Sequence, residues 1–174
     1  MPQVLRVISL GVMAIWLGAT VFVTFGVGPA LFSQEVQQLV PRYHAGRIAQ
    51  VLLNSFFWFQ IGCAAASVLL LLAGWAYAGR APRRWATGVL VALVGLVLLG
   101  GLWMQPRLRT LHATMYAPDS SLEEKTSATQ RFRRWHGVSQ VGNLLVLIGV
   151  SLYFVHLALP TGPRPASKYP VSYY

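Results

Sequence analysis

Charged side chains are scarce in this sequence, and acidic ones are scarcer still. Charged residues make up 10% of the 174 residues, and Asp and Glu together contribute four. Soluble domains carry about 25% charged residues, so the deficit excludes an ordinary water-facing surface. Hydrophobic residues make up 55% of the chain, which favours lipid as the surrounding solvent.

The few charges are mostly positive. Fourteen Lys and Arg residues give a net charge of +10. A basic chain is also typical of nucleic-acid binding. Here the cations fall in short stretches between long apolar runs, where they match anionic lipid headgroups better. We therefore expect membrane lipids as partners and no nucleic acid.

Cysteine and catalytic motifs are also lacking. The single Cys63 excludes an intramolecular disulfide and is typical of a small buried hydrophobe. No Gly-rich phosphate loop, G-x-S-x-G or H-E-x-x-H occurs. The apolar runs contain no Asp, Glu, Lys or interior Arg, which argues against a proton-coupled transporter. A passive pathway lined by amides and hydroxyls stays open, and we predict a non-enzymatic protein. Its sequence does not itself require a cofactor, and haem or copper stays an open alternative.

Four long apolar runs divide the chain. Each is close to or above the roughly 20 residues that a helix needs to cross the hydrocarbon layer, and none shows the alternation of a membrane β-barrel. The first run is too long for a signal peptide, so we expect it to be retained. The sequence predicts an all-α, polytopic membrane protein: a four-helix transmembrane bundle over residues 1–159 and a Pro/Tyr-rich tail over 160–174. The expected helices are about 5–31, 48–77, 85–103 and 138–159.

The long linker of residues 104–137 carries most of the charge and is itself expected to be helical. Leu108 and Leu111 follow helical spacing. After an Ala-Pro-Asp turn, Ser121 with Glu124 is predicted to form a capping box. Two interpretations stay open: a helical extramembrane hairpin between helices three and four, or two short interfacial helices.

The orientation in the membrane is predicted from Lys and Arg, because the positive-inside rule largely ignores acids. The N-terminus, the second linker and the tail share one side, with six cations and no acids; the other side has eight cations and four acids. The cluster of Arg80, Arg83 and Arg84 favours cytoplasmic termini. We expect a multi-pass protein of a bacterial inner membrane.

Polar side chains occur at helical spacing around the fourth apolar run and at isolated positions in the first two. They are His136, Ser139, Asn143 and Ser151, then Thr20, Thr24, Asn54 and Gln60. Hydrogen bonding between helices is the ordinary use of such groups in lipid. A lined cavity or ligand pocket is the alternative.

Small residues on one side of three runs predict close helix packing. They are Gly11, Ala14 and Gly18, then Gly62 and Ala66, then Gly142 and Gly149. These faces and the aromatic helix edges are also surfaces on which the chain would contact membrane protein partners or a second copy of itself.

Three histidines, His44, His112 and His136, fall on the same side of the membrane. With two methionines nearby in sequence, copper or haem binding is a hypothesis, since imidazole and thioether are suitable ligands. No H-x-x-x-H or C-x-x-C spacing supports it. Capping and pairing are alternatives, such as His112 facing Glu124 across the linker. Arg107 lies directly after the third run. Its ordinary interpretation is a side chain that snorkels to the membrane edge, and the more specific one is a site for a lipid headgroup or another anion.

Three stretches resemble motifs of the transmembrane protein 205-like family. Residues 22–32 resemble the end of its first helix, residues 103–107 its W-x-x-P-R, and residues 131–143 its F-x-x-x-H-G-x-S-x-x-x-N. The resemblance implies a four-helix membrane domain of largely unknown function. It also implies one cluster at a membrane edge, formed by Pro106, Arg107, His136, Ser139 and Asn143. Structural positions of these motifs are Pro29, Trp103, Pro106 and Gly137.

Eukaryotic members of that family are linked to handling of platinum-type compounds, which implies soft-metal or small-molecule handling. In our first hypothesis, the chain is non-enzymatic and handles a soft metal or small molecule on the face formed by the first and third linkers. The site would comprise His136, Asn143, Ser139, His44, His112 and Arg107. In the second, it is a structural or accessory subunit of a larger membrane complex. A haem-binding membrane protein is a further alternative.

Overall fold

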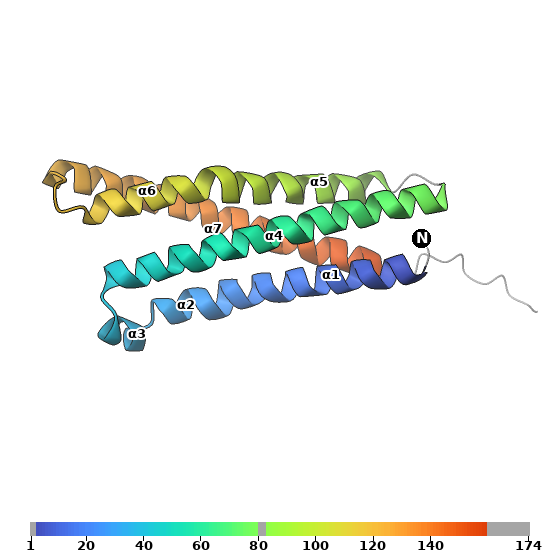
Figure 1. Ribbon diagram of the computed structural model, residues 1–174, viewed down its shortest axis with the longest axis horizontal. Helices are drawn as coiled ribbons and strands as arrows, with labels where there is room; N and C mark the ends of the chain where they lie inside the picture. Colours follow the sequence, from blue (N-terminus) through green and yellow to red (C-terminus); the bar gives the residue numbers. More distant parts are fainter. Residues whose placement is uncertain (1–2, 80–82, 160–174) are drawn as a thin grey trace, which may run out of the picture.

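A computed structural model describes residues 3–79 and 83–159, and throughout these ranges the regular structure is helical (Figure 1). The helices join into four long rods, each long and apolar enough to cross a membrane, as the four apolar runs predicted. The rods are α1 (Gln3–Val21), η1 (Phe22–Val27) and α2 (Gly28–Leu31); α4 (Arg42–Ala78); α5 (Arg84–Leu98), η2 (Leu99–Met104) and α6 (Gln105–Tyr116); and α7 (Leu122–Ala158).

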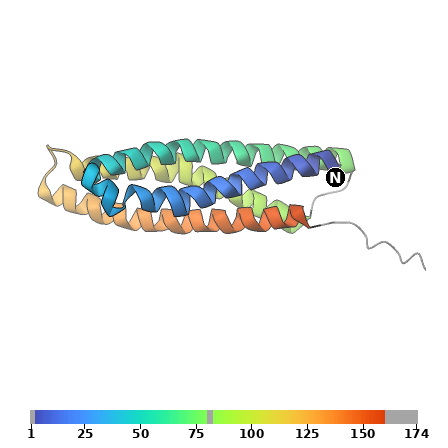
Figure 2. The same cartoon turned by 90° about the horizontal axis from the view of Figure 1, so that it is seen from below.

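The rods form a four-helix bundle in which neighbours run antiparallel (Figures 1 and 2). Both α1 and α5 contact α4 and α7, so α4 and α7 stand on one diagonal. The turns that follow α2 and α6 lie at one end, which we call the distal end. The start of α1 and the end of α7 lie at the opposite, proximal end.

The first linker is more helical than the sequence analysis predicted. It contains the short helix α3 (Gln34–Leu39), whose N-cap Ser33 accepts a hydrogen bond from the Val36 N–H. Helix α4 then begins at Arg42 rather than near residue 48. The Pro/Tyr-rich tail and Arg80 lie outside the described residues. Of the predicted arginine cluster, the structure therefore describes Arg83 and Arg84.

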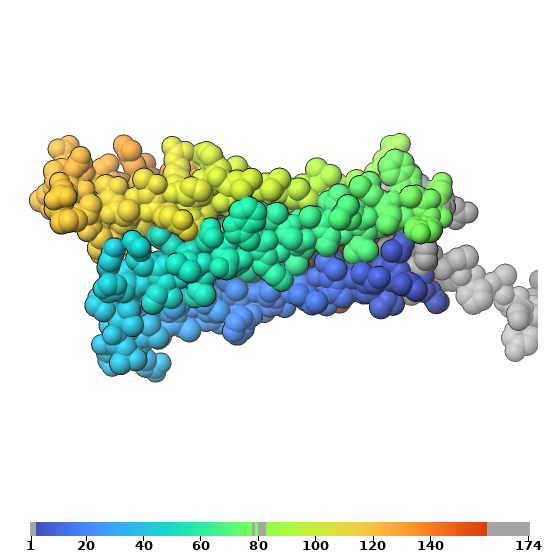
Figure 3. Space-filling model, viewed as in Figure 1, coloured from blue at the N-terminus to red at the C-terminus, as the bar shows by residue number. Residues whose placement is uncertain are grey.

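The third linker is absorbed into two rods. Helix α6 follows η2 without a break, and α7 passes through Gly137 as a single helix. The predicted capping box is present: the Ser121 N–H donates to Glu124 Oε2 (2.8 Å), and the Glu124 N–H donates to Ser121 Oγ (3.2 Å). In the space-filling view, the α6–α7 turn reaches further at the distal end than the start of α4 (Figure 3).

Two π-helical segments precede prolines. Segment η1 ends two residues before Pro29, and η2 ends two residues before Pro106. Proline has no N–H to donate, and its ring crowds the carbonyl one turn earlier. The helix therefore relaxes into wider turns at both places without breaking. These are two of the three stretches that carry the family resemblance.

Packing between rods depends on a small residue at one of the five predicted glycine positions. A Cβ built at Gly149 would lie 2.8 Å from Leu93 Cδ2, so this glycine lets α7 approach α5 closely, as predicted. In contrast, a Cβ at Gly11 or Gly18 meets no heavy atom within 4 Å. Those two positions face outward and play no part in packing within the described bundle.

Arg6 closes the proximal end. Its guanidinium donates to the carbonyls of Leu157 (3.0 Å), Ala158 (2.9 Å) and Leu159 (3.1 Å). The last turn of a helix leaves its carbonyls without intrahelical partners and carries partial negative charge. One arginine therefore caps α7 and ties the first rod to the fourth.

Candidate functional site

The residues predicted to form one site lie in three separate groups. The three histidines contact aromatic side chains toward the distal end, Arg107 packs on two tryptophans, and Asn143 lies within the bundle. Asn143 is seven residues from His136 along α7, which is about 10 Å at the helical rise. The single edge cluster implied by the resemblance is therefore divided between two levels of the bundle.

His112 and His136 belong to an aromatic cluster built from α4, α6 and α7. The Tyr43 ring centroid lies 5.9 Å from that of His112 and 5.0 Å from that of Tyr116. Phe132 lies 6.0 Å from His112 and stacks on His136 at 5.7 Å. We call these five residues the His112 cluster, because His112 contacts three of the other four.

His112 is 5% exposed. A Cβ built at Gly46 would overlap the imidazole at Nε2, so the absence of a side chain there lets α4 pack directly on the ring. The buried Nδ1 has no hydrogen-bond partner among the described residues. The suggested pairing with Glu124 is wrong, because that carboxylate lies in the Ser121 cap instead.

His44 and His136 are exposed, and His44 approaches the cluster only through its ring. The His44 ring meets Tyr43 edge-on at 5.1 Å. Within residues 3–79 and 83–159, no group of three or more His, Cys, Asp or Glu side chains is placed to hold a metal ion. The three histidines thus share aromatic neighbours without forming a three-residue ligand set.

Arg107 packs against the two tryptophans where α6 meets α7. Its guanidinium carbon lies 5.0 Å from the centroid of Trp103 and 5.3 Å from that of Trp135. The two indoles meet edge to face at 5.1 Å. Both contacts lie in the cation–π range of about 6 Å, so the side chain is held in place rather than free.

Asn143 bonds between helices, as predicted for buried amides. Its Nδ2 donates to Thr24 Oγ1 (2.8 Å), and that hydroxyl donates to the Thr20 carbonyl (2.6 Å). Ser139 instead donates to the carbonyl of His136 on its own helix (2.9 Å). Its O–H is therefore donated within its own helix, and the described residues show no hydrogen bond between Ser139 and Asn143.

Only half of a second group of polar side chains was singled out from the sequence. Four buried side-chain atoms have no hydrogen-bond partner within the described part of the chain: Trp16 Nε1, Gln50 Nε2, Gln60 Oε1 and His112 Nδ1. Of their residues, Gln60 is 2% exposed and Trp16 is fully buried. Among these, only Gln60 and His112 were singled out from the sequence.

Gln50 and Gln60 lie on the inward seam of α4, His112 packs against it at Gly46, and Trp16 shares the core cluster with Ala64 of this seam. Its positions recur at intervals of three, four or seven residues: Gly46, Gln50, Phe57, Gln60, Ala64 and Ser67. Such spacing places residues on one face of a helix. That periodicity, with glutamines interrupting an apolar run, was the signal available in the sequence.

Contacts with neighbouring helices indicate where these residues lie along the axis of α4, a position that we call their level. His112 meets Gly46, and Gln105 Nε2 donates to the main-chain carbonyl of Gln50 (3.1 Å). Ser67 Oγ lies 3.5 Å from Met13 Sδ. Because α1 is antiparallel to α4, Trp16 stands level with Ala64, one turn from Gln60.

The four atoms therefore form one series, which we call the α4 line. It runs from His112, level with Gly46, to Trp16, level with Ala64. At the helical rise, this distance is about 27 Å. The Asn143–Thr24 bond lies between the levels of Gln50 and Gln60, so further polar groups interrupt the apolar core between the ends of the line.

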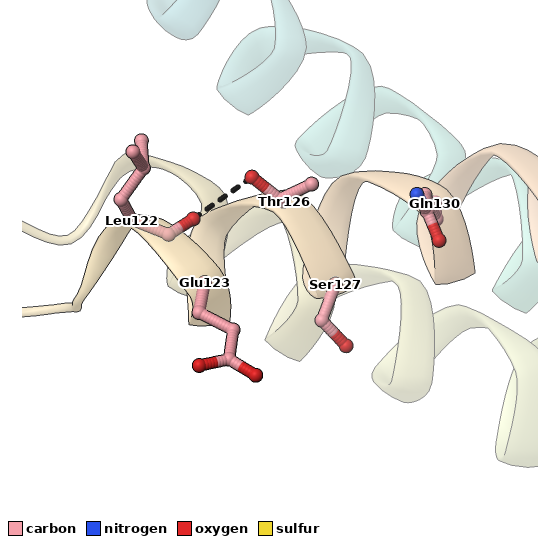
Figure 4. A pocket seen from close by; sticks show the side chains of 5 residues that line it. All are labelled: Leu122, Glu123, Thr126, Ser127 and Gln130. Carbon is pink, nitrogen blue, oxygen red and sulfur yellow. Dashed lines mark hydrogen bonds between the residues drawn. The ribbon is translucent and has the colours of Figure 1, made fainter.

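A surface hollow at the start of α7 involves none of these groups. Its lining residues come from one face of this single helix: Leu122, Glu123, Thr126, Ser127 and Gln130 (Figure 4). The Thr126 hydroxyl donates to the Leu122 carbonyl (2.8 Å). The hollow is wide open and its one acidic group is exposed, so nothing in it resembles a built site.

The fold and these groups define a helical-bundle protein with four candidate membrane spans and a partly polar interior. A protein-family model described as "Domain of unknown function (DUF4149)" matches residues 11–117, and the chain belongs to this family. No curated protein and no solved structure matches the chain. The matched stretch contains the whole α4 line and Arg107, and it ends before α7.

Proposed function

We propose that the chain is a non-enzymatic membrane protein that takes small, uncharged, hydrogen-bonding molecules into its core along the α4 line. One observation carries this proposal: the buried side-chain atoms without a partner in the described residues lie on α4 or on helices packed against it, at successive levels along its inward seam. A buried polar group without a hydrogen bond is unfavourable by about 1–3 kcal/mol. A series of them is therefore a feature that a ligand with donors and acceptors would stabilise.

The chemistry of the line indicates which molecules fit. The Trp16 indole and the Gln50 amide offer N–H donors, and Gln60 Oε1 is an acceptor. Neutral His112 offers either a donor or an acceptor at Nδ1. No Asp, Glu, Lys or Arg stands on the α4 seam positions, so the line lacks the groups that stabilise ions at depth in a membrane. Water-sized or slightly larger neutral molecules suit it best.

The membrane setting of this proposal rests on the sequence. We propose that the chain is of the transmembrane protein 205-like type and crosses a bacterial inner membrane with cytoplasmic termini. In that setting, α6 and the start of α7 form an extramembrane hairpin. The His112 cluster then marks the end of the line nearest the loop side, where molecules enter from the aqueous boundary.

A soft-metal or haem function is the alternative. The described residues include no group of three or more His, Cys, Asp or Glu side chains placed to hold a metal ion. Metal analysis and an absorption spectrum of chain purified in mild detergent address it directly. Stoichiometric copper or a haem band would favour that function and contradict the proposal made above.

The proposal is tested with purified full chain in liposomes. Stopped-flow light scattering measures the permeability of the vesicles to water, glycerol and urea. We expect permeability to at least one of these above that of empty liposomes, and a marked loss of the excess in Gln60→Leu. The matched control is Gln130→Leu, on the outer surface of α7, which should retain the wild-type excess. Wild-type vesicles equal to empty ones for all three molecules would overturn the proposal.

A second candidate, an accessory subunit, is favoured by a different observation. Gly11, Ala14 and Gly18 are exposed along α1, and both glycines have open space where a Cβ would lie. Outward small residues let another membrane helix approach closely. Native mass in mild detergent tests this candidate: a defined larger assembly that Gly18→Leu disrupts supports it, whereas a lone monomer contradicts it.

A further inference from the structure

Arg107 differs from the other arginines for which the structure gives side-chain contacts. Arg6 donates to three helix carbonyls, Arg42 donates to Gln37 Oε1 (2.9 Å), and Arg47 donates to the Tyr43 hydroxyl (3.4 Å). For Arg107, the contacts are two aromatic faces. Within the described residues, its N–H groups make no hydrogen bond to the protein.

The two indoles restrict the guanidinium without using its donors. A guanidinium is planar and carries five N–H groups around its edge. Aromatic rings attract it through their faces and accept no conventional hydrogen bond from it. Arg107 is exposed, so its edge is open to the surroundings while its position is fixed by Trp103 and Trp135.

The position along the bundle matches a membrane–water boundary. Trp103 ends the third apolar run, and Arg107 lies one helical turn beyond it. Tryptophan is enriched at the level of lipid headgroups. Helices α6 and α7 are antiparallel, and Trp103 contacts Trp135. Arg131 therefore stands level with Arg107 on the facing helix, which adds a second positive charge to this side.

We propose that Arg107, held by Trp103 and Trp135, is a binding site for a phosphate group, presented by an anionic lipid headgroup. Planar arginine donors match two phosphate oxygens at once, which gives stronger and more directional bonds than a point charge. This site is separate from the α4 line and does not depend on its function. Free inorganic phosphate shares the same chemistry, so the experiment includes it as a distinct ligand.

The test uses full chain in mild detergent and native mass spectrometry. Phosphatidylglycerol, phosphatidylcholine and inorganic phosphate are added separately at matched concentration. We expect retained phosphatidylglycerol adducts on the wild type, a several-fold loss in Arg107→Gln, and partial retention in Arg107→Lys. Trp135→Leu should also weaken retention, although it leaves every charge in place.

The matched control is Arg109→Gln, which removes an exposed charge from the same helix and should retain the lipid. Equal loss in Arg109→Gln and Arg107→Gln would show general charge attraction and overturn the proposal, as would equal retention of phosphatidylcholine and phosphatidylglycerol. If inorganic phosphate binds in an Arg107-dependent way and the lipid is not retained, the proposal that a lipid is the ligand is wrong. Circular dichroism tests whether each variant is folded. If Arg107→Gln is not folded, Arg107→Lys provides the comparison with the wild type.

Discussion

Asn143 on α7 donates a hydrogen bond to the hydroxyl of Thr24 in η1, joining two helices across 119 positions of sequence. The same hydroxyl donates to the carbonyl of Thr20, so donor and acceptor capacity are both used. Amide and hydroxyl groups within a membrane bundle have few other partners. This pair therefore fixes the first rod against the fourth beside a π-helical segment.

The contribution of this bond is measurable by a double-mutant cycle. We expect Asn143→Ala and Thr24→Val each to lower the free energy of unfolding. Their coupling energy should be about 0.6 kcal/mol and at most about 1.7 kcal/mol, the range for hydrogen bonds between membrane helices. Unfolding in mixed micelles, followed by circular dichroism, provides the four free energies. Strictly additive effects would contradict a direct bond.

Gly46 is expected to tolerate no side chain, because a Cβ there overlaps the His112 imidazole. Gly46→Ala should lower the free energy of unfolding by about 1–3 kcal/mol, as overpacking does in closely packed interiors. The control is Gly18→Ala, where the added Cβ meets open space. A loss at Gly18 as large as that at Gly46 would point to a backbone effect rather than the predicted overlap.

The four long apolar helices and the α7 cap were predictable because each depends on short-range physics. Exclusion of apolar runs from water and reciprocal bonding between Ser121 and Glu124 need no tertiary information. The helix α3 was missed, although Ser33 and Glu35 offered a cap and a first-turn acid. Local signals of that kind were present but lay within a stretch interpreted as a linker.

The candidate groups were harder to predict because they depend on which helices become neighbours. Arg107 was singled out from its place after the third run, but its contact with Trp135 needs the register of α6 against α7. The sequence placed Asn143 in one cluster with His136, whereas its partner is Thr24 on another helix. Trp16 carried no signal of its own, since an indole in an apolar helix is ordinary.

Arg6 is expected to stabilise the last turn of α7. Arg6→Gln should remove most of its bonds to three carbonyls and weaken the cap by about 0.3–1 kcal/mol. Arg6→Lys keeps the charge but loses the planar set of donors. The stability of its cap should lie between those of the wild type and Arg6→Gln. Hydrogen exchange by mass spectrometry should be faster near Val155 and Leu157 in the glutamine variant. Exchange that is unchanged there, with faster exchange elsewhere, would contradict the capping role.

The most direct test of the α4 line is whether Trp16 meets small polar molecules inside the bundle. Proton-detected solid-state NMR of chain labelled with ¹⁵N-tryptophan, in liposomes, measures polarisation transfer from water to the indole N–H, and Trp16→Phe assigns the signal. The account predicts rapid transfer to Trp16 that is strongly reduced in Gln60→Leu and unchanged in Gln130→Leu. A Trp16 indole that receives no transfer in the wild type, while the exposed tryptophans do, would contradict the proposed function.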